Sequence, residues 1–462
     1  MKKRALWMPA AAFALVMALS ACGGKGGESA PSGGSSAGPS QGASAPASPS
    51  ATQAERFDVS LRHIQIGEAQ KFRKAILDEV VKKTEAEVPG LVIQMDGVED
   101  SFNRWTKLPA EMAAGNPPKI FDVFGGPGDA LKYARAGKML DVTPILDELG
   151  IKDKFTDYST FVLDGKIYGL PIGASSEGWF YNKDLLAKYG ISVPKTLEEL
   201  EAAFDKLKQN GVTPIAMGSQ AAWVPNMIIN TLIARYAGPD FNFQASTGAK
   251  KWNDPAVVAA YAKYQEWEKK GYFTKGELGI DYAGQTNEFI AGKAAFLFDG
   301  TWRISSFQTG GIGEALAGKV GYFPFPAVPN GVGDQTAVNY NQNNGYGFSA
   351  DLNDREKTAV KAFIKNLYTD EYQIRGFKED KVLPSMKVDP SQLTTDDPIM
   401  KQVLETDAAA QSVFPHFDSL VPSKVNTETE TQLQNLIAGK ATPQEAADAI
   451  QKVLEAELAA IQ

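Results

Sequence analysis

The sequence predicts an α/β fold of two hinge-linked lobes, and three regions of the chain carry this prediction. In residues 57–144, short apolar strands alternate with amphipathic helices, which is typical of a mainly parallel sheet flanked by helices. Residues 196–302 again combine helices with strands, as a second lobe would. Between these regions, residues 164–186 are extended but contain several glycines and Pro171, so the chain can bend there. An ordinary loop beside a sheet is the alternative for this segment.

The first 54 residues are predicted to be an export signal followed by a tether. Lys2, Lys3 and Arg4 precede an apolar stretch that is too short to span a bilayer and is typical of a secretion signal. Cys22 is the only cysteine and follows Leu-Ser-Ala, which resembles the lipobox of bacterial lipoproteins. The resemblance implies a signal peptide over residues 1–21 and lipidation of Cys22. The alternative is a chance cysteine after an ordinary cleaved signal. Residues 22–54 are mostly Gly, Ser, Ala and Pro, which predicts a disordered tether.

Charge and composition exclude several classes of function. The formal net charge is −8, and it becomes −11 when the three basic residues of the signal are removed, which argues against nucleic acid as a partner. The two histidines and one cysteine provide no zinc ligand set, and no phosphate-binding glycine motif or nucleophile elbow occurs. We therefore expect no metal and no cofactor. A pair of carboxylates for glycoside cleavage stays open, because it is defined by a distance in space.

The first predicted lobe offers two ligand-facing loops. Strands are expected over residues 57–66, 91–95 and 120–124, with helices over 71–87 and 102–114 and another starting at 131. Ligands of open α/β sheets bind beyond the carboxyl ends of strands. The loops at 67–70 and 125–129 have this position. Their candidate ligand-binding residues are Glu68, Gln70, Gly126 and Asp129. A helix cap or a solvated loop residue is the alternative for each polar one.

The crossing segment begins with a tight turn at Asp164-Gly165-Lys166 between two short strands. It continues through the break at residues 169–171 into a strand that ends at 179–182. Glu177 and Trp179 lie close to this crossing. We therefore include both among the candidate ligand-binding residues.

The second predicted lobe contains a helix over 196–210, a strand over 213–217, a helix that ends near residue 236, and a helix that starts near residue 253. The aromatic residues of that last helix have helical spacing, which favours a core role over a sugar-binding role. Residues 289–302 end this lobe's sheet. Trp223, Asp299 and Trp302 are its candidate ligand-binding residues.

The chain then returns to the first lobe. A strand over 320–325 leads to a second crossing, and residues 339–346 are rich in amides and tyrosines that could face a ligand or form a plain loop. Asn344, Tyr346 and Phe417 are the candidates here. The capping-box pattern of Thr442 and Glu445 predicts a final amphipathic helix. The predicted boundaries are 55–168 and 326–375 for lobe 1, and 169–325 and 376–462 for lobe 2.

Several stretches together resemble a known family. G-K-I-Y-G-L-P (165–171), W-F-Y-N-K-D-L-L (179–186), P-K-T-L-E-E-L (194–200) and the F-x-x-G-K-A-A motif at 289–302 are similar to the extracellular solute-binding proteins of sugar ABC importers, the class of maltose-binding protein. The resemblance covers most of the chain from Phe57. It implies a class II-like periplasmic-binding-protein fold, a mono- or oligosaccharide ligand, ABC permease subunits as partners, a membrane lipid anchor, and a monomer without enzymatic activity.

The resemblance also implies roles for aromatic residues. The family's tryptophan at the position of Trp302 stacks on a sugar ring, and its segments that correspond to Trp223 and Phe417 contact ligand. A pyranose presents an apolar C–H face to an aromatic plane and a belt of hydroxyls to amides and charges. Three alternatives stay open. They are a charged solute such as a uronate oligosaccharide, which would need Arg104 or Arg303 in the cleft, a cell-surface glycoside-cleaving enzyme, and a ligand-reporting partner of a membrane sensor.

Overall fold

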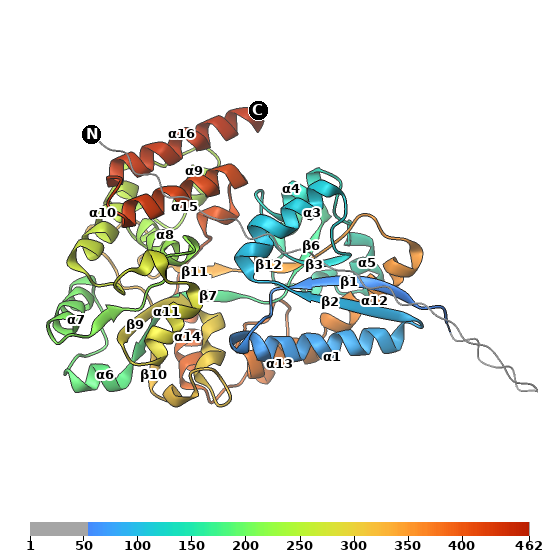
Figure 1. Cartoon of the computed structure of the whole chain (residues 1–462), viewed down its shortest axis with the longest axis horizontal. Helices are drawn as coiled ribbons and strands as arrows, with labels where there is room; N and C mark the ends of the chain where they lie inside the picture. The colour runs from blue at the N-terminus through green and yellow to red at the C-terminus, as the bar shows by residue number, and fades with distance from the viewer. Residues whose placement is uncertain (1–53, 462) are drawn as a thin grey trace, which may run out of the picture. The chain divides into compact units, whose positions relative to one another are not determined.

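The computed structural model describes residues 54–461. Two sheets with separate cores form two lobes, so the predicted two-lobed α/β architecture is confirmed (Figure 1). The predicted signal peptide, Cys22 and nearly all of the predicted tether lie outside the described residues. Among residues 54–461, no helix is both long enough and apolar enough to cross a bilayer.

Lobe 1 is built on a five-stranded sheet in the order β2-β1-β3-β12-β6. Its strands are β1 (Phe57–His63), β2 (Leu91–Gly97), β3 (Ile120–Phe124), β6 (Gly169–Pro171) and β12 (Asn344–Phe348). β1 runs parallel to β2 and β3, whereas β12 is antiparallel to β3 and β6.

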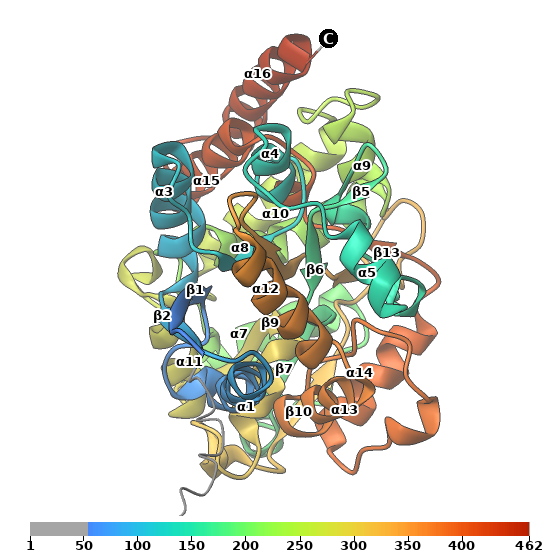
Figure 2. The ribbon, with the colours of Figure 1, turned by 90° about the vertical axis from the view of Figure 1, so that its right-hand side faces the viewer.

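Helices cover both faces of this sheet because alternate residues of each central strand point to opposite sides. Ile120 joins the core under α1 (Lys71–Glu87) and α12 (Asp354–Leu367), and Phe121 joins the core under α3 (Leu108–Ala114) and α4 (Ala130–Arg135). α1 and α12 lie side by side when the protein is viewed from the lobe 1 side (Figure 2). The remaining helices of lobe 1 are α2 (Asp100–Phe102), α5 (Thr143–Leu149) and α13 (Asp370–Arg375).

The predicted turn at the start of the crossing segment is confirmed. It joins β4 (Val162–Leu163) to β5 (Lys166–Ile167) through Asp164 and Gly165, whose φ angles are 51° and 75°. Two left-handed residues in succession give the type I′ turn that matches the twist of a hairpin.

Lobe 2 is built on a sheet in the order β13-β11-β7-β9-β8, with β10 also paired to β7. Its strands are β7 (Ser175–Asn182), β8 (Thr213–Ile215), β9 (Ala294–Gly300), β10 (Val320–Phe323), β11 (Val338–Asn341) and β13 (Val413–Phe414). β7 is antiparallel to β9, β10 and β11, so the prediction of mainly parallel sheets is wrong. β11 is antiparallel to β7 because β7 carries the chain from lobe 1 into lobe 2 and β11 carries it back toward lobe 1.

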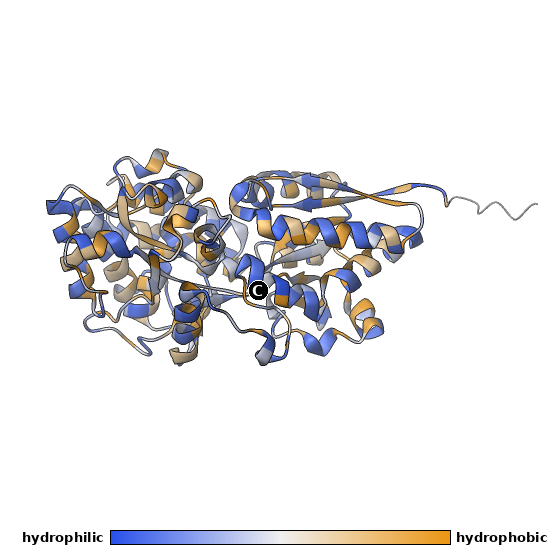
Figure 3. Cartoon of the chain, turned by 90° about the horizontal axis from the view of Figure 1, so that it is seen from below, coloured by the Kyte–Doolittle hydropathy of each residue, from blue (hydrophilic) through white to orange (hydrophobic). Residues whose placement is uncertain are grey.

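The helices of lobe 2 are α6 (Lys183–Lys188), α7 (Leu197–Gln209), α8 (Trp223–Ala237), α9 (Phe241–Ser246), α10 (Pro255–Lys270), α11 (Tyr282–Ile290), α14 (Pro398–Ala409), α15 (Ser423–Ile437) and α16 (Pro443–Ile461). Hydrophilic and hydrophobic residues alternate along the helices in Figure 3, as in helices with one buried face. Tyr261, Tyr264 and Trp267 of α10 are fully buried, which confirms their predicted core role.

Strand pairing moves the predicted lobe boundaries. β6 belongs to the lobe 1 sheet through its pairing with β12, and β11 belongs to the lobe 2 sheet through β7. The chain therefore crosses at residues 172–174 and 342–343, and once more between α13 and α14. The prediction assigned residues 169–171 to lobe 2 and 326–341 to lobe 1, because sequence alone does not show which sheet a short strand joins.

Candidate functional site

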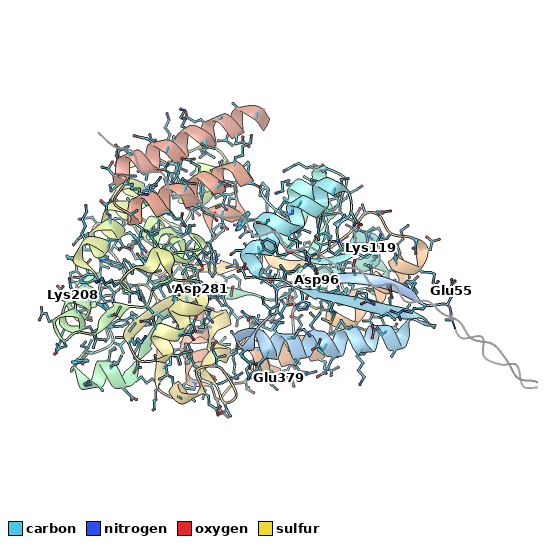
Figure 4. The ribbon with its side chains drawn as sticks, in the orientation of Figure 1. Glu55, Asp96, Lys119, Lys208, Asp281 and Glu379 are labelled. Carbon is cyan, nitrogen blue, oxygen red and sulfur yellow. The ribbon has the colours of Figure 1, made fainter. Side chains whose placement is uncertain are left out.

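A cleft with a volume of about 1120 Å³ lies between the lobes. Lobe 1 lines it with the loop after β1, the segment after β2 and the end of β3, and lobe 2 lines it with the N-terminal ends of α8 and α11, the segment after β9 and one face of α15. Asp281, just before α11, lies on the side of lobe 2 that faces lobe 1 (Figure 4). This volume is slightly larger than that of most small-molecule binding pockets, which fits a ligand of several rings.

Three aromatic side chains from separate segments of lobe 2 meet at the cleft wall. The indole Nε1 of Trp302 donates to the Tyr282 hydroxyl at 2.6 Å. The rings of Trp223 and Tyr282 meet edge to face, with centroids 4.7 Å apart. All three are only partly buried and line the cleft. They form an aromatic surface of the kind that takes the apolar face of a sugar ring.

The segment after β9 fixes the position of Trp302. β9 ends at Gly300, and a Cβ there would collide with the Trp302 ring, so the indole lies directly against this backbone. The buried Asp299 accepts from the Tyr282 hydroxyl at 2.7 Å and pairs with Arg303 Nε at 3.1 Å. Asp299 does not line the cleft, which corrects its predicted ligand contact. Its carboxylate instead holds the groups that position the aromatic surface.

On the opposite wall, Arg104 of lobe 1 contacts both aromatic rings and carboxylates. Its guanidinium stacks on Trp105 and Phe124, at 4.2 Å and 4.4 Å from their ring centroids. It pairs with Asp129 at 2.7 Å within lobe 1 and with Asp418 of lobe 2 at 3.1 Å. Burial would lower the pKa of Arg104, but the two aspartates outweigh burial and raise it. Arg104 is therefore a fixed cation shared by the two lobes.

Two carboxyl groups beside this arginine have strongly raised pKa values. Burial, with a further contribution from Asp418, raises the pKa of Glu430 to about 7. Burial raises the pKa of Asp100 to about 6, although Arg104 opposes the rise. Both residues line the cleft. At pH 7 the Glu430 carboxyl is therefore only partly ionised.

A buried acid–base pair also lines the cleft. Glu177 Oε1 and His416 Nε2 are 2.6 Å apart, and both residues line the cleft. Burial would lower the pKa of His416, but Glu177 outweighs burial and raises it. The other carboxylate atom, Glu177 Oε2, is buried without a hydrogen-bond partner among the described residues. Glu177 thus lines the cleft, and its contact with a ligand stays a prediction.

Polar groups complete the cleft at the crossings and on lobe 1. Asn344 lines the cleft and donates through Nδ2 to Asp122 Oδ1 at 3.0 Å. Glu68 and Gln70 also line the cleft, and Glu68 forms an exposed ion pair with Lys71 at 3.0 Å. Such amide and carboxylate groups can hydrogen-bond to hydroxyls.

Five further candidates lie away from the cleft lining, and each is a correction. Trp179 is fully buried against Phe298 and other rings of the lobe 2 core, and Phe417 stacks on Trp252 with centroids 3.7 Å apart. Tyr346 is 2% exposed and packs edge to face on Phe363.

The other two corrections concern the loop after β3. Asp129 is buried behind Arg104, and Gly126 (φ 104°) lies against the backbone of Ser419. A residue near a strand end can face the cleft, the core or the other lobe, and only packing decides which.

Several residues that line the cleft are not among those predicted from the sequence. Helix α15 turns Thr427, Glu430, Thr431 and Gln434 toward the cleft, at the i, i+3, i+4 and i+7 spacing of one helix face. That polar stripe is visible in the sequence, but a stripe facing water has the same pattern. Trp105 and Tyr282 were also missed, because neither lies in a motif that the resemblance covers.

Comparisons with known proteins agree with this architecture. A family model for bacterial extracellular solute-binding proteins matches residues 69–374. The chain is 27% identical over 345 residues to the galactooligosaccharide-binding protein of Bacillus subtilis, a match that covers 72% of this chain and 76% of that protein.

It is also 29% identical over 273 residues to an uncharacterized ABC transporter extracellular-binding protein of Pyrococcus horikoshii, but this match spans only 58% of that protein and 55% of this chain. A solved structure of a chitin oligosaccharide binding protein is 42% identical, with a TM-score of 0.81, and the match covers 87% of this chain and all of that one. Since the family model matches well over half of the sequence, this chain belongs to the family of bacterial extracellular solute-binding proteins.

Proposed function

We propose that this protein is the extracytoplasmic solute-binding component of a carbohydrate ABC importer, and that its cleft binds an oligosaccharide. The observation that carries the proposal is the aromatic surface of Trp302, Tyr282 and Trp223 in a cleft that Trp105 of lobe 1 also lines. The similarity to a chitin oligosaccharide binding protein and to a galactooligosaccharide-binding protein supports a ligand of this class.

The mechanism we propose is closure of the lobes over the sugar. Pyranose rings stack on the aromatic surface, while hydroxyls exchange hydrogen bonds with Asn344, Gln70 and the polar face of α15. A ligand that contacts both lobes stabilises the closed arrangement through its higher affinity for that state. Micromolar affinity would need roughly −8 kcal/mol in total. The closed form is then the shape that a permease recognises.

The charges of the cleft bear on the alternative of a uronate ligand. Arg104 and Arg303 both line the cleft, as that alternative requires. Each already pairs with aspartates, however, Arg104 with Asp129 and Asp418, and Arg303 with Asp299. An anionic sugar would have to displace these carboxylates, so a ligand without negative charge is favoured.

A titration of purified protein tests this proposal. We expect calorimetry to detect tight binding of one class among neutral chitin, galacto- and xylo-oligosaccharides, with weaker binding of uronates. Trp302→Ala should reduce this binding, and no shortened sugar should appear in a product assay. Tightest binding of uronates, or release of product, would replace the proposal with the charged-solute or the enzyme alternative.

The membrane attachment is part of the same proposal. Cleavage of residues 1–21 and lipidation of Cys22 would tether the protein to the outer face of the cell membrane, within reach of permease subunits. We expect metabolic labelling with a fatty-acid analogue in a bacterial host to mark the wild-type chain but not Cys22→Ser. Light scattering should give the mass of a monomer. Labelling of the Cys22→Ser chain would contradict the assignment of this cysteine.

A further inference from the structure

We propose, on the basis of the proposed function, that the cleft prefers amino-sugar oligosaccharides with a free, protonated amine over their N-acetylated counterparts. The amine would lie near Glu177, Asp418 and Glu430. Two features of the cleft favour such a ligand: its excess of carboxylates and one buried carboxylate oxygen without a donor.

The cleft has an excess of negative charge. Among the described residues, its lining contains eight carboxylate side chains, against three arginines, one histidine (His416) and no lysine. All three arginines are already paired: Arg73 with Asp380 at 2.8 Å, Arg104 with Asp129 and Asp418, and Arg303 with Asp299. The protein therefore leaves no unpaired guanidinium in this lining for an anion, whereas several carboxylates are not ion-paired.

The excess is concentrated around Arg104. This guanidinium is the cation for Asp129 and Asp418, and Asp100 and Glu430 lie within its electrostatic influence. Within residues 54–461, the one hydrogen bond to the Glu430 side chain comes from Asn426 Nδ2, at 3.2 Å. Two of these four carboxyl groups, Asp100 and Glu430, have no ion-pair partner of their own among the described residues. Burial is the main cause of the raised pKa values of Glu430 and Asp100.

Glu177 supplies an independent observation. Its side chain is 1% exposed, its Oε1 atom contacts His416, and its Oε2 atom is buried without a partner although the residue lines the cleft. A buried carboxylate oxygen without a donor costs free energy until a donor arrives. An ammonium group has three donors and a positive charge. It would supply the donor that Oε2 lacks and would add a cation to the acidic cleft. An N-acetyl group offers one donor and no charge.

The experiment compares two chitin-derived tetrasaccharides of equal length, one fully N-acetylated and one fully deacetylated, by calorimetry with the full-length protein. We expect the deacetylated sugar to bind about tenfold more tightly at about 50 mM salt, with a smaller difference at about 300 mM salt because ions screen the attraction. Glu430→Gln and Glu177→Gln should each reduce the ratio of the two affinities. Glu428→Gln is the matched control, because Glu428 is on the same helix but outside the cleft lining.

The outcomes separate this inference from the proposed function. Equal or tighter binding of the N-acetylated sugar overturns the amine preference and leaves oligosaccharide binding intact. Failure of both these sugars and of the neutral panel to bind overturns the proposed function as well. An unchanged affinity ratio in both cleft variants overturns the assignment of the carboxylates. The comparison of the two sugars on the wild-type chain does not depend on whether any variant folds.

Discussion

Arg104 of lobe 1 and Asp418 of lobe 2 form an ion pair across the cleft, with Nη2 and Oδ2 3.1 Å apart. The two side chains are only 11% and 16% exposed, so water screens their attraction weakly. Lobes that open about the crossings at residues 172–174 and 342–343 would have to separate this pair. The contact therefore couples the charges of the cleft to the arrangement of the lobes.

Asp418→Asn should loosen this coupling. Loss of one partner of a largely buried pair costs about 1–3 kcal/mol, and we expect sugar affinity to fall about tenfold. Small-angle scattering of the ligand-free variant should give a larger radius of gyration than the wild type. Asp78→Asn removes a charge from an exposed pair on α1 and is the control. If scattering and affinity both match the wild type, the pair does not couple the lobes.

Trp302→Ala should remove most of the stacking energy. We expect a loss of about 1–2 kcal/mol, or roughly tenfold in affinity by calorimetry, because the apolar face of a sugar loses its aromatic partner. Tyr282→Phe should have a smaller effect, since the ring remains but the hydroxyl that holds Trp302 and Asp299 is lost. Phe243→Ala alters an exposed ring outside the cleft and should bind normally. Normal binding by Trp302→Ala would rule out stacking at this position.

Gly300→Ala should displace the indole without changing its chemistry. The added methyl group would occupy the space of the Trp302 ring, so we expect an affinity loss close to that of Trp302→Ala. Gly279→Ala is the control, because a Cβ there meets no atom within 4 Å. Circular dichroism should show both variants folded. A Gly300→Ala protein that binds like the wild type would mean that the ring can move freely.

The stability of the ligand-free protein should fall as pH rises through neutrality. The pKa of Glu430 is raised from 4.5 to about 7, so the stability it contributes is complete below 4.5 and is lost as pH rises through about 7. His416 acts in the same direction, because its pKa is also raised. We expect the Tm of the wild type to fall between about pH 5 and pH 8, and that of Glu430→Gln to fall less. If the Tm of Glu430→Gln falls with pH as steeply as that of the wild type, the raised pKa of Glu430 is contradicted. Glu428→Gln is the control, and its Tm should fall with pH as the wild-type Tm does.

Local sequence determined the elements whose stabilising contacts are close in the chain. The turn at Asp164 and Gly165 follows from two residues that tolerate positive φ angles. The start of α16 follows from Thr442 and Glu445, which exchange hydrogen bonds as predicted: Glu445 N donates to Thr442 Oγ1 at 3.2 Å, and Thr442 N donates to Glu445 Oε2 at 2.8 Å.

The tertiary structure alone decided which of the candidate ligand-binding residues face the cleft. Trp179 and Trp302 both belong to motifs of the resemblance. Helices α7 and α10 pack over the first, whereas the second lies two residues beyond the end of β9 and reaches the cleft. Arg104 and Asp418 are far apart in sequence and meet only because the lobes fold onto each other. Burial and long-range pairing depend on how the whole chain packs, and no short stretch of sequence contains that information.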